Sequence, residues 1–172
     1  MSTTFTNFAK AYRSGRKALK FTHDDYADPA GQKPNHELQK HGVNLYKHLV
    51  RKMGPPIGYG RHRITFANKH FVVKLPRSIA GISANHDEVD LYKRDKGERH
   101  HLAPSKLVKT KSGIDLLVMP KLDVERFDKE TNAMGMGVRA KVPRSQKWIW
   151  NYDGGQVGYD RKGKLKAFDY AG

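Results

Sequence analysis

Residues 57–75 read IGYGRHRITFANKHFVVKL, and this stretch predicts a β-hairpin around which the rest of the chain is organised. The segments Arg63–Phe66 and Phe71–Leu75 alternate or run apolar like two strands, and Ala67–His70 forms the turn between them. Lys74 lies inside the second strand, between apolar neighbours. Because a buried ammonium needs water, a carboxylate or a bound anion, Lys74 is the first candidate functional residue.

The segment after the hairpin offers a carboxylate partner for Lys74. A helix is expected to start at Ser83–Asn85, where polar capping residues precede apolar positions at helical spacing. Packed on the hairpin, such a helix places Glu88 where its carboxylate pairs with the Lys74 ammonium. Asp87 is the alternative partner if the helix register slips by one residue.

This order of residues resembles the small lobe of the protein-kinase-like fold. That family lays a glycine-rich loop over the nucleotide phosphates, and its strand lysine contacts the phosphates while pairing with a helix glutamate. The resemblance implies that Gly58 and Gly60 form the loop. It further implies that Lys74 and Glu88 are the lysine and the glutamate, and that Met119 in the sequence MPKL begins the hinge against which adenine packs.

The C-terminal part extends the resemblance. Residues 155–159 (GQVGY) and 166–170 (KAFDY) are similar to the family's catalytic-loop and metal-binding hairpin. The resemblance implies that Gln156 and Asp169 hold magnesium, and that ATP and magnesium are the cofactors.

Two departures from the family pattern bear on catalysis. Asn151 occupies the position of the catalytic aspartate, and an amide does not accept a proton as a carboxylate does. Asp153 lies nearby as a substitute, at a different spacing. Because the sequence ends three residues after Asp169, we expect no activation segment and a much reduced large lobe.

The composition narrows the function classes. The 172 residues carry a formal net charge of +16, which predicts attraction to a polyanion such as nucleic acid, an acidic protein or an anionic membrane surface. The absence of cysteine excludes disulfides, thiolate zinc sites and cysteine nucleophiles. No apolar run approaches the roughly 20 residues of a membrane span, and the N-terminus lacks the apolar core of a signal peptide, so we expect a cytoplasmic protein.

The expected fold class is α+β, in three parts. Residues 1–34 form a basic N-terminal helical arm and a linker. Residues 35–122 form a helix, with an apolar stripe interrupted at Gly42, followed by a kinase-like small lobe made of an antiparallel sheet and one helix. Residues 123–172 form a truncated large lobe that ends in the metal-binding-type hairpin.

Three functions are compatible with these features. The first is a degenerate kinase-like protein, a pseudokinase, that binds and modulates a partner macromolecule, as a phage inhibitor of a machine in the host cytoplasm would. The second is an active minimal ATP-dependent phosphotransferase, and the third is a basic nucleic-acid-binding or virion-associated protein. An ordinary α+β domain, in which Lys74 extends to solvent and Asp169 caps a turn, is the structural alternative. The oligomeric state is left open by the sequence.

Overall fold

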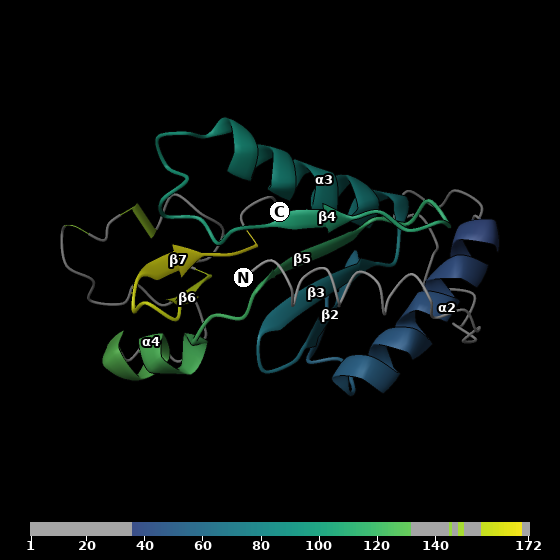
Figure 1. The fold of residues 1–172 in the computed structure, drawn as a ribbon, viewed down its shortest axis with the longest axis horizontal. Coiled ribbons are helices and arrows are strands. Elements are labelled where there is room, and N and C mark those ends of the chain that lie inside the picture. The colour runs from purple at the N-terminus through teal and green to yellow at the C-terminus, as the bar shows by residue number, and fades with distance from the viewer. Residues whose placement is uncertain (1–35, 132–144, 146–147, 150–155, 170–172) are drawn as a thin grey trace.

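The computed structural model describes residues 36–131, 145, 148–149 and 156–169 (Figure 1). The predicted arm, residues 1–34, lies outside the described residues. The elements, in chain order, are α2 (His36–Met53), β1 (Gly58–Tyr59), β2 (Arg63–Ala67), β3 (Phe71–Pro76), α3 (Ile79–Arg94), β4 (Lys106–Val108), β5 (Leu116–Pro120), α4 (Val124–Thr131), β6 (Val157–Tyr159) and β7 (Leu165–Ala167).

A five-stranded antiparallel sheet forms the centre of the fold, with strand order β1-β2-β3-β5-β4. Strands β2 and β3 form the predicted hairpin, and the Asn68 side chain closes its turn by accepting hydrogen bonds from the backbone amides of His70 and Phe71, both at 2.8 Å. The α+β class expected from the sequence is therefore confirmed, as an antiparallel sheet with helices packed against it.

Helix α2 runs without a break through Gly42, where the apolar stripe was expected to be interrupted. The helix ends at Met53, and the next residue, Gly54, has a backbone φ of +87°, in the left-handed region that glycine adopts without strain. The Gly54 amide donates to the Val50 carbonyl at 2.9 Å, and two prolines follow, which prevent a further helical turn.

Helix α3 begins at Ile79, so the predicted start at Ser83–Asn85 is wrong by one turn. Ser78 is the N-cap, and its hydroxyl accepts from the Gly81 amide at 3.1 Å. The helix start was missed because Gly81 is typical of a loop. Here the glycine is needed for packing: a Cβ at residue 81 would lie 2.1 Å from the His62 carbonyl oxygen.

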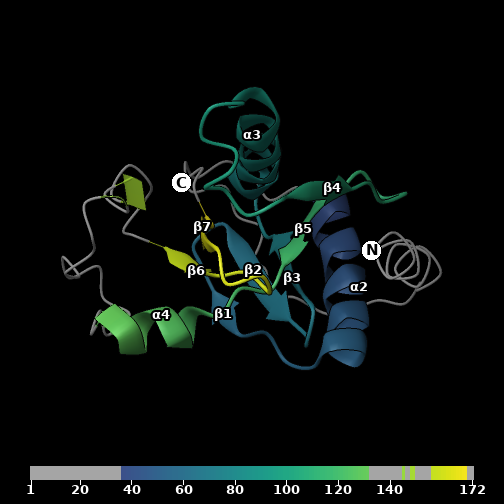
Figure 2. The same ribbon diagram turned by 60° about the vertical axis from the view of Figure 1, so that its left-hand side comes forward.

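Helices α2 and α3 cover opposite faces of the sheet (Figure 2). On the α2 face, side chains from the helix and from β2, β3 and β5 form a buried apolar cluster that includes Leu45, Leu49, Ile64, Phe66, Val73, Leu75, Leu116 and Val118. On the α3 face, the buried cluster contains Val89, Ala103, Leu117, Met119 and Leu122. Lys74 points to the α3 face, because alternate residues of a strand point to opposite sides.

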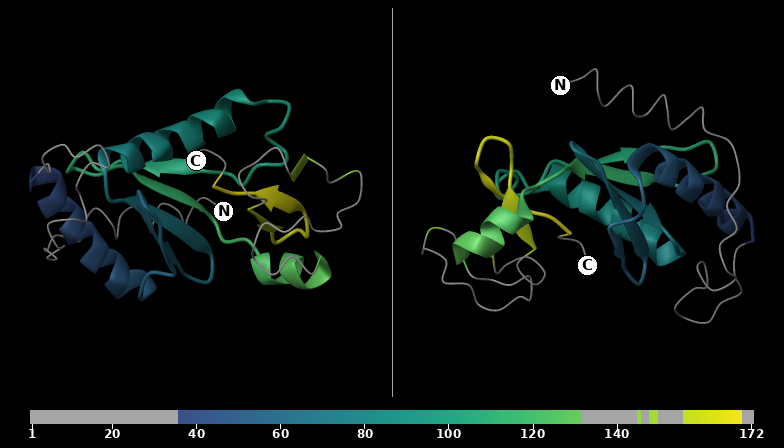
Figure 3. Two further views of the ribbon diagram at one scale, coloured as in Figure 1. Left: turned by 180° about the vertical axis from the view of Figure 1, so that it is seen from behind. Right: turned by 90° about the horizontal axis from the view of Figure 1, so that it is seen from below.

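The hairpin of β6 and β7 lies with α4 at the opposite end of the molecule from α2 (Figure 3). It joins the rest of the fold through single bridges, Leu102 with Ala167 and Asp123 with Tyr159. Beneath it, Leu102, Phe127, Ile149, Val157 and Ala167 are buried together, so this end has its own small core. Within the described part of the chain, no helix has the length and apolar character needed to cross a membrane.

Candidate functional site

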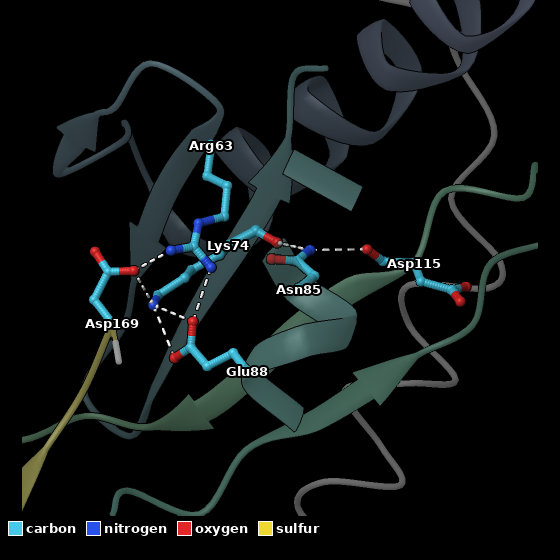
Figure 4. A network of polar contacts seen from close by, with 6 residues as sticks. All are labelled: Arg63, Lys74, Asn85, Glu88, Asp115 and Asp169. Carbon is cyan, nitrogen blue, oxygen red and sulfur yellow. Dashed lines mark hydrogen bonds and ion pairs between the residues drawn. The ribbon is translucent and has the colours of Figure 1, made fainter. Parts of the chain in front are cut away.

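The Lys74 side chain is buried, with 4% of the residue exposed. Its Nζ donates to both carboxylate oxygens of Glu88, at 3.0 Å to Oε1 and 2.9 Å to Oε2 (Figure 4). The predicted pairing of the strand lysine with Glu88 is thus present. Asp87, the alternative partner, is exposed on the same helix.

An amide one turn before Glu88 fixes α3 against the sheet. The fully buried Asn85 Nδ2 donates to the carbonyl oxygens of Lys74, at 3.3 Å, and of Asp115, at 3.0 Å (Figure 4). These two bonds join α3 to β3 and to the segment before β5. Because residues three apart share one helix face, the same contacts direct Glu88 toward Lys74.

Asp169 reaches the same ammonium from the end of the chain. Its Oδ1 accepts from Lys74 Nζ at 3.0 Å, across a sequence separation of 95 residues. The Asp169 backbone has φ of +56°, in the left-handed region that aspartate tolerates better than most side chains. A third of its side chain, 33%, remains exposed, so Asp169 is the part of the cluster that faces solvent.

Arg63 is the member of the cluster that the sequence analysis did not single out. Its NH1 donates to Glu88 Oε2 at 2.8 Å, and its NH2 donates to Asp169 Oδ1. Arg63 precedes Thr65 by two residues, and Thr65 lies opposite Lys74 in the sheet. Because side chains alternate along a strand, Arg63 lies on the same face of the sheet as Lys74. This alternation is the sequence pattern that could have identified Arg63 as a member of the cluster.

The four side chains form one ion cluster in which two cations balance two carboxylates, and we call it the Arg63–Lys74–Glu88–Asp169 cluster. Glu88 is fully buried and accepts only from the two cations among the contacts described. A buried carboxylate stays ionised only where such partners offset its lost hydration. Each cation contacts both carboxylates, so a change at any one member affects the other three.

Burial by itself raises the pKa of the Asp169 carboxyl. The Lys74 ammonium and the Arg63 guanidinium, with hydrogen bonds from Lys74 and Gln156, outweigh burial and hold that pKa below its ordinary value of 3.8. Asp169 is therefore ionised at neutral pH, and its charge is balanced by the two basic partners.

This lowered pKa predicts how stability depends on pH. A carboxyl with a depressed folded-state pKa stabilises the fold above its unfolded value, and that contribution is lost as pH falls through the folded-state pKa. We expect the free energy of unfolding of Asp169→Asn to fall less than that of the wild type between about pH 5 and about pH 2, as measured by urea denaturation. Asp90→Asn, at an exposed site on α3, is the control for the loss of one carboxylate. A curve for Asp169→Asn identical to that of the wild type would contradict the prediction.

The two glycines predicted to form a phosphate loop lie in the short β1–β2 hairpin. Gly58 pairs with Thr65, which in turn pairs with Lys74, so these three residues form one row across three strands. Gly60 is in the turn, where its amide donates to the Arg63 carbonyl at 2.9 Å and a Cβ would lie 3.2 Å from that oxygen. The hairpin thus borders the cluster, and a phosphate contact stays a prediction.

Met119 lies on β5 with 2% of the residue exposed, in the apolar cluster on the α3 face. Two residues later, the Lys121 amide already donates to the His70 carbonyl at 2.9 Å. An adenine contact at this hinge stays a prediction. The structure assigns the Met119 side chain to the core between the sheet and α3.

The residues predicted to hold magnesium were Gln156 and Asp169. They lie together, since the Gln156 side chain hydrogen-bonds to the Asp169 carboxylate. The Asp169 Oδ1 oxygen already accepts from an ammonium and a guanidinium, so a divalent cation at that oxygen would have to compete with both. Magnesium binding at this pair stays a prediction. Among the described residues, no group of three or more His, Asp or Glu side chains is placed to hold a metal ion.

The candidate catalytic residues, Asn151 and Asp153, lie outside the described residues.

No protein-family model, no curated protein and no solved structure matches this chain. The assignment of a function therefore depends on the geometry of the Arg63–Lys74–Glu88–Asp169 cluster.

Proposed function

We propose that the protein is a degenerate kinase-like protein that binds a nucleotide through its phosphates and acts by binding a partner macromolecule, without phosphoryl transfer. The observation that carries the proposal is the burial of Lys74 between two carboxylates, Glu88 from α3 and Asp169 from the segment after β7. In the protein-kinase-like fold a strand lysine pairs with a helix glutamate in the same way, and the metal-site aspartate belongs to the same nucleotide site.

An ordinary structural role accounts less well for this arrangement. A lysine in a strand can extend its ammonium to solvent at little cost, whereas Lys74 is buried against two anions that must also lose hydration. Asp169 adds a left-handed backbone conformation at a non-glycine residue. Costs of this kind concentrate at functional sites.

Two features favour binding over catalysis. Asn151 stands at the position of the family's catalytic aspartate, so the usual proton acceptor is absent from that position. The Asp169 carboxylate is neutralised by Arg63 and Lys74, which leaves it poorly suited to the metal chemistry of phosphoryl transfer. The net charge of +16 supports an acidic partner, either a protein or a nucleic acid.

Thermal unfolding with and without ATP tests the nucleotide site. A ligand at about 100 times its dissociation constant stabilises a protein by about 2.7 kcal/mol, so the wild-type midpoint is expected to rise clearly. Lys74→Met keeps the aliphatic part of the side chain and removes the ammonium, so its midpoint is expected to stay at its own ligand-free value. Each protein is compared with its own baseline, because Lys74→Met also lowers stability.

Lys69→Met is the matched control. Lys69 is exposed in the turn between β2 and β3, and its removal lowers the net charge by the same amount. An equal loss of the ATP shift in both variants would mean that ATP binds by general charge attraction, against the proposal. Transfer of labelled phosphate from ATP to a protein, by the wild type but not by Lys74→Met, would replace binding with phosphotransfer as the function.

A further inference from the structure

We infer that Arg63 takes the place of a divalent cation at Asp169, so that this protein binds the triphosphate chain of a nucleotide without magnesium. The inference rests on the proposed nucleotide site and specifies its ligand: the metal-free polyanion. It identifies Arg63 as the residue that sets this preference.

The contacts of Arg63 are those of a bridging cation. Its guanidinium joins Glu88 to Asp169, two carboxylates contributed by α3 and by the end of the chain. Only 12% of its side chain is exposed. A guanidinium is permanently charged and presents several donors in a rigid plane, so it neutralises both carboxylates without a metal.

Asp169 Oδ1 is the atom for which Arg63 and a metal ion would compete. It already accepts from Arg63 NH2 and from Lys74 Nζ. A divalent cation at this oxygen would lie beside an ammonium and a guanidinium, and the mutual repulsion would oppose its binding. If either cation moved away, the fully buried Glu88 carboxylate would lose one of its two positively charged partners, which is costly.

A phosphate chain, in contrast to a metal ion, is attracted by the two cations of the cluster. Arg63 and Lys74 are adjacent donors whose common acceptor, Asp169, is the most exposed member of the cluster. A phosphate oxygen that displaces the Asp169 carboxylate gains both donors, and guanidinium and ammonium groups are the side chains that bind phosphate best. Metal-free ATP carries more negative charge than its magnesium complex, so the uncomplexed form is expected to be the better ligand.

The test is a comparison of thermal midpoints for ATP with EDTA, ATP with magnesium, and magnesium alone. For the wild type we expect ATP with EDTA to raise the midpoint at least as much as ATP with magnesium, and magnesium alone to change nothing. In Arg63→Gln, Lys74 alone faces two carboxylates, and affinity for ATP in EDTA is expected to fall about tenfold to a hundredfold. Magnesium is expected to restore part of that loss, because Asp169 is then released from its bridging cation.

Arg61→Gln is the control, since Arg61 is exposed in the neighbouring turn and its loss changes the net charge equally. If Arg61→Gln lowered the affinity for ATP in EDTA as much as Arg63→Gln does, the inference would be overturned, because ATP binding would then depend on general charge and not on the cluster. If Arg63→Gln does not fold, Arg63→Lys retains the charge and is expected to keep binding ATP in EDTA; its failure to do so while folded would also count against the inference.

The wild-type arms separate the two proposals. A shift that requires magnesium would overturn the present inference and leave nucleotide binding intact. No shift with either form of ATP would overturn both. Tripolyphosphate in EDTA distinguishes the source of the phosphate chain: a shift equal to that of ATP would support the inference and show that the nucleoside adds no recognition.

Discussion

Glu88→Ala is expected to lower the free energy of unfolding by about 3–5 kcal/mol, the usual cost of removing one partner from a buried ion pair. Glu88 is fully buried and receives hydrogen bonds from both Lys74 and Arg63. Its removal leaves two cations with Asp169 as their remaining partner in the cluster, and it opens a cavity beside α3. The loss is to be measured by urea denaturation at neutral pH.

Asp90→Ala is the matched control for this measurement. Asp90 lies on the same helix and pairs with Lys93 at 3.6 Å, but its side chain is 55% exposed. A surface pair of this kind contributes about 0–1 kcal/mol, so Asp90→Ala should change stability little. Glu88→Gln keeps the side-chain volume and removes the charge, and it should fall between the two. If Glu88→Ala destabilised the fold as little as Asp90→Ala, water would have to compensate Lys74 and Arg63 in place of the lost carboxylate. The four side chains would then not form a charge-balanced unit.

Local patterns were enough to predict the hairpin and the Lys74–Glu88 pair. The turn residues and the strand period of residues 63–76 depend on nearest neighbours, and an ion pair between consecutive elements needs only that they pack together. The choice of Glu88 over Asp87 needed the helix register, which the contacts of Asn85 set in the structure.

Long-range contacts were beyond the reach of such patterns. The Arg63–Asp169 contact spans 106 residues, and no periodicity connects two positions so far apart. The family resemblance named Asp169, but as a metal ligand, whereas the structure pairs it with two side-chain cations. The start of α3 was misplaced for a related reason, since Gly81 in the helix depends on the closeness of His62, which lies nineteen residues earlier in the chain (81 − 62).

Helix α3 connects the turn between β1 and β2 to the ion cluster. At its first turn Ser78 and Gly81 contact the region around His62, at its centre Asn85 binds the backbone of β3, and Glu88 then enters the cluster. Because these contacts lie along one rigid helix, a displacement at its first turn is transmitted to Glu88. The position of α3 therefore governs both the stability of the fold and the geometry around Lys74.

Gly81→Ala tests this connection, and we expect it to destabilise the fold by about 1–3 kcal/mol and to weaken the ATP-induced midpoint shift. Two effects oppose each other. Alanine is the better helix former by about 1 kcal/mol, which favours the variant. Against this, the added Cβ would lie 2.1 Å from the His62 carbonyl oxygen, a backbone atom, so α3 or the turn before β2 must shift. The steric term is expected to prevail, because a backbone oxygen cannot move aside as a flexible side chain does.

Gly97→Ala separates this clash from a general effect of replacing glycine. A Cβ at residue 97 would meet its nearest atom, Asp95 Oδ1, at 3.7 Å, an ordinary contact at an exposed position. Its unfolding midpoint and ATP shift are expected to match those of the wild type. If Gly81→Ala proved as stable as Gly97→Ala, the close approach of α3 to His62 would be disproved. If it were destabilised but kept the full ATP shift, the first turn of α3 would be shown to act on stability alone, without reaching Glu88.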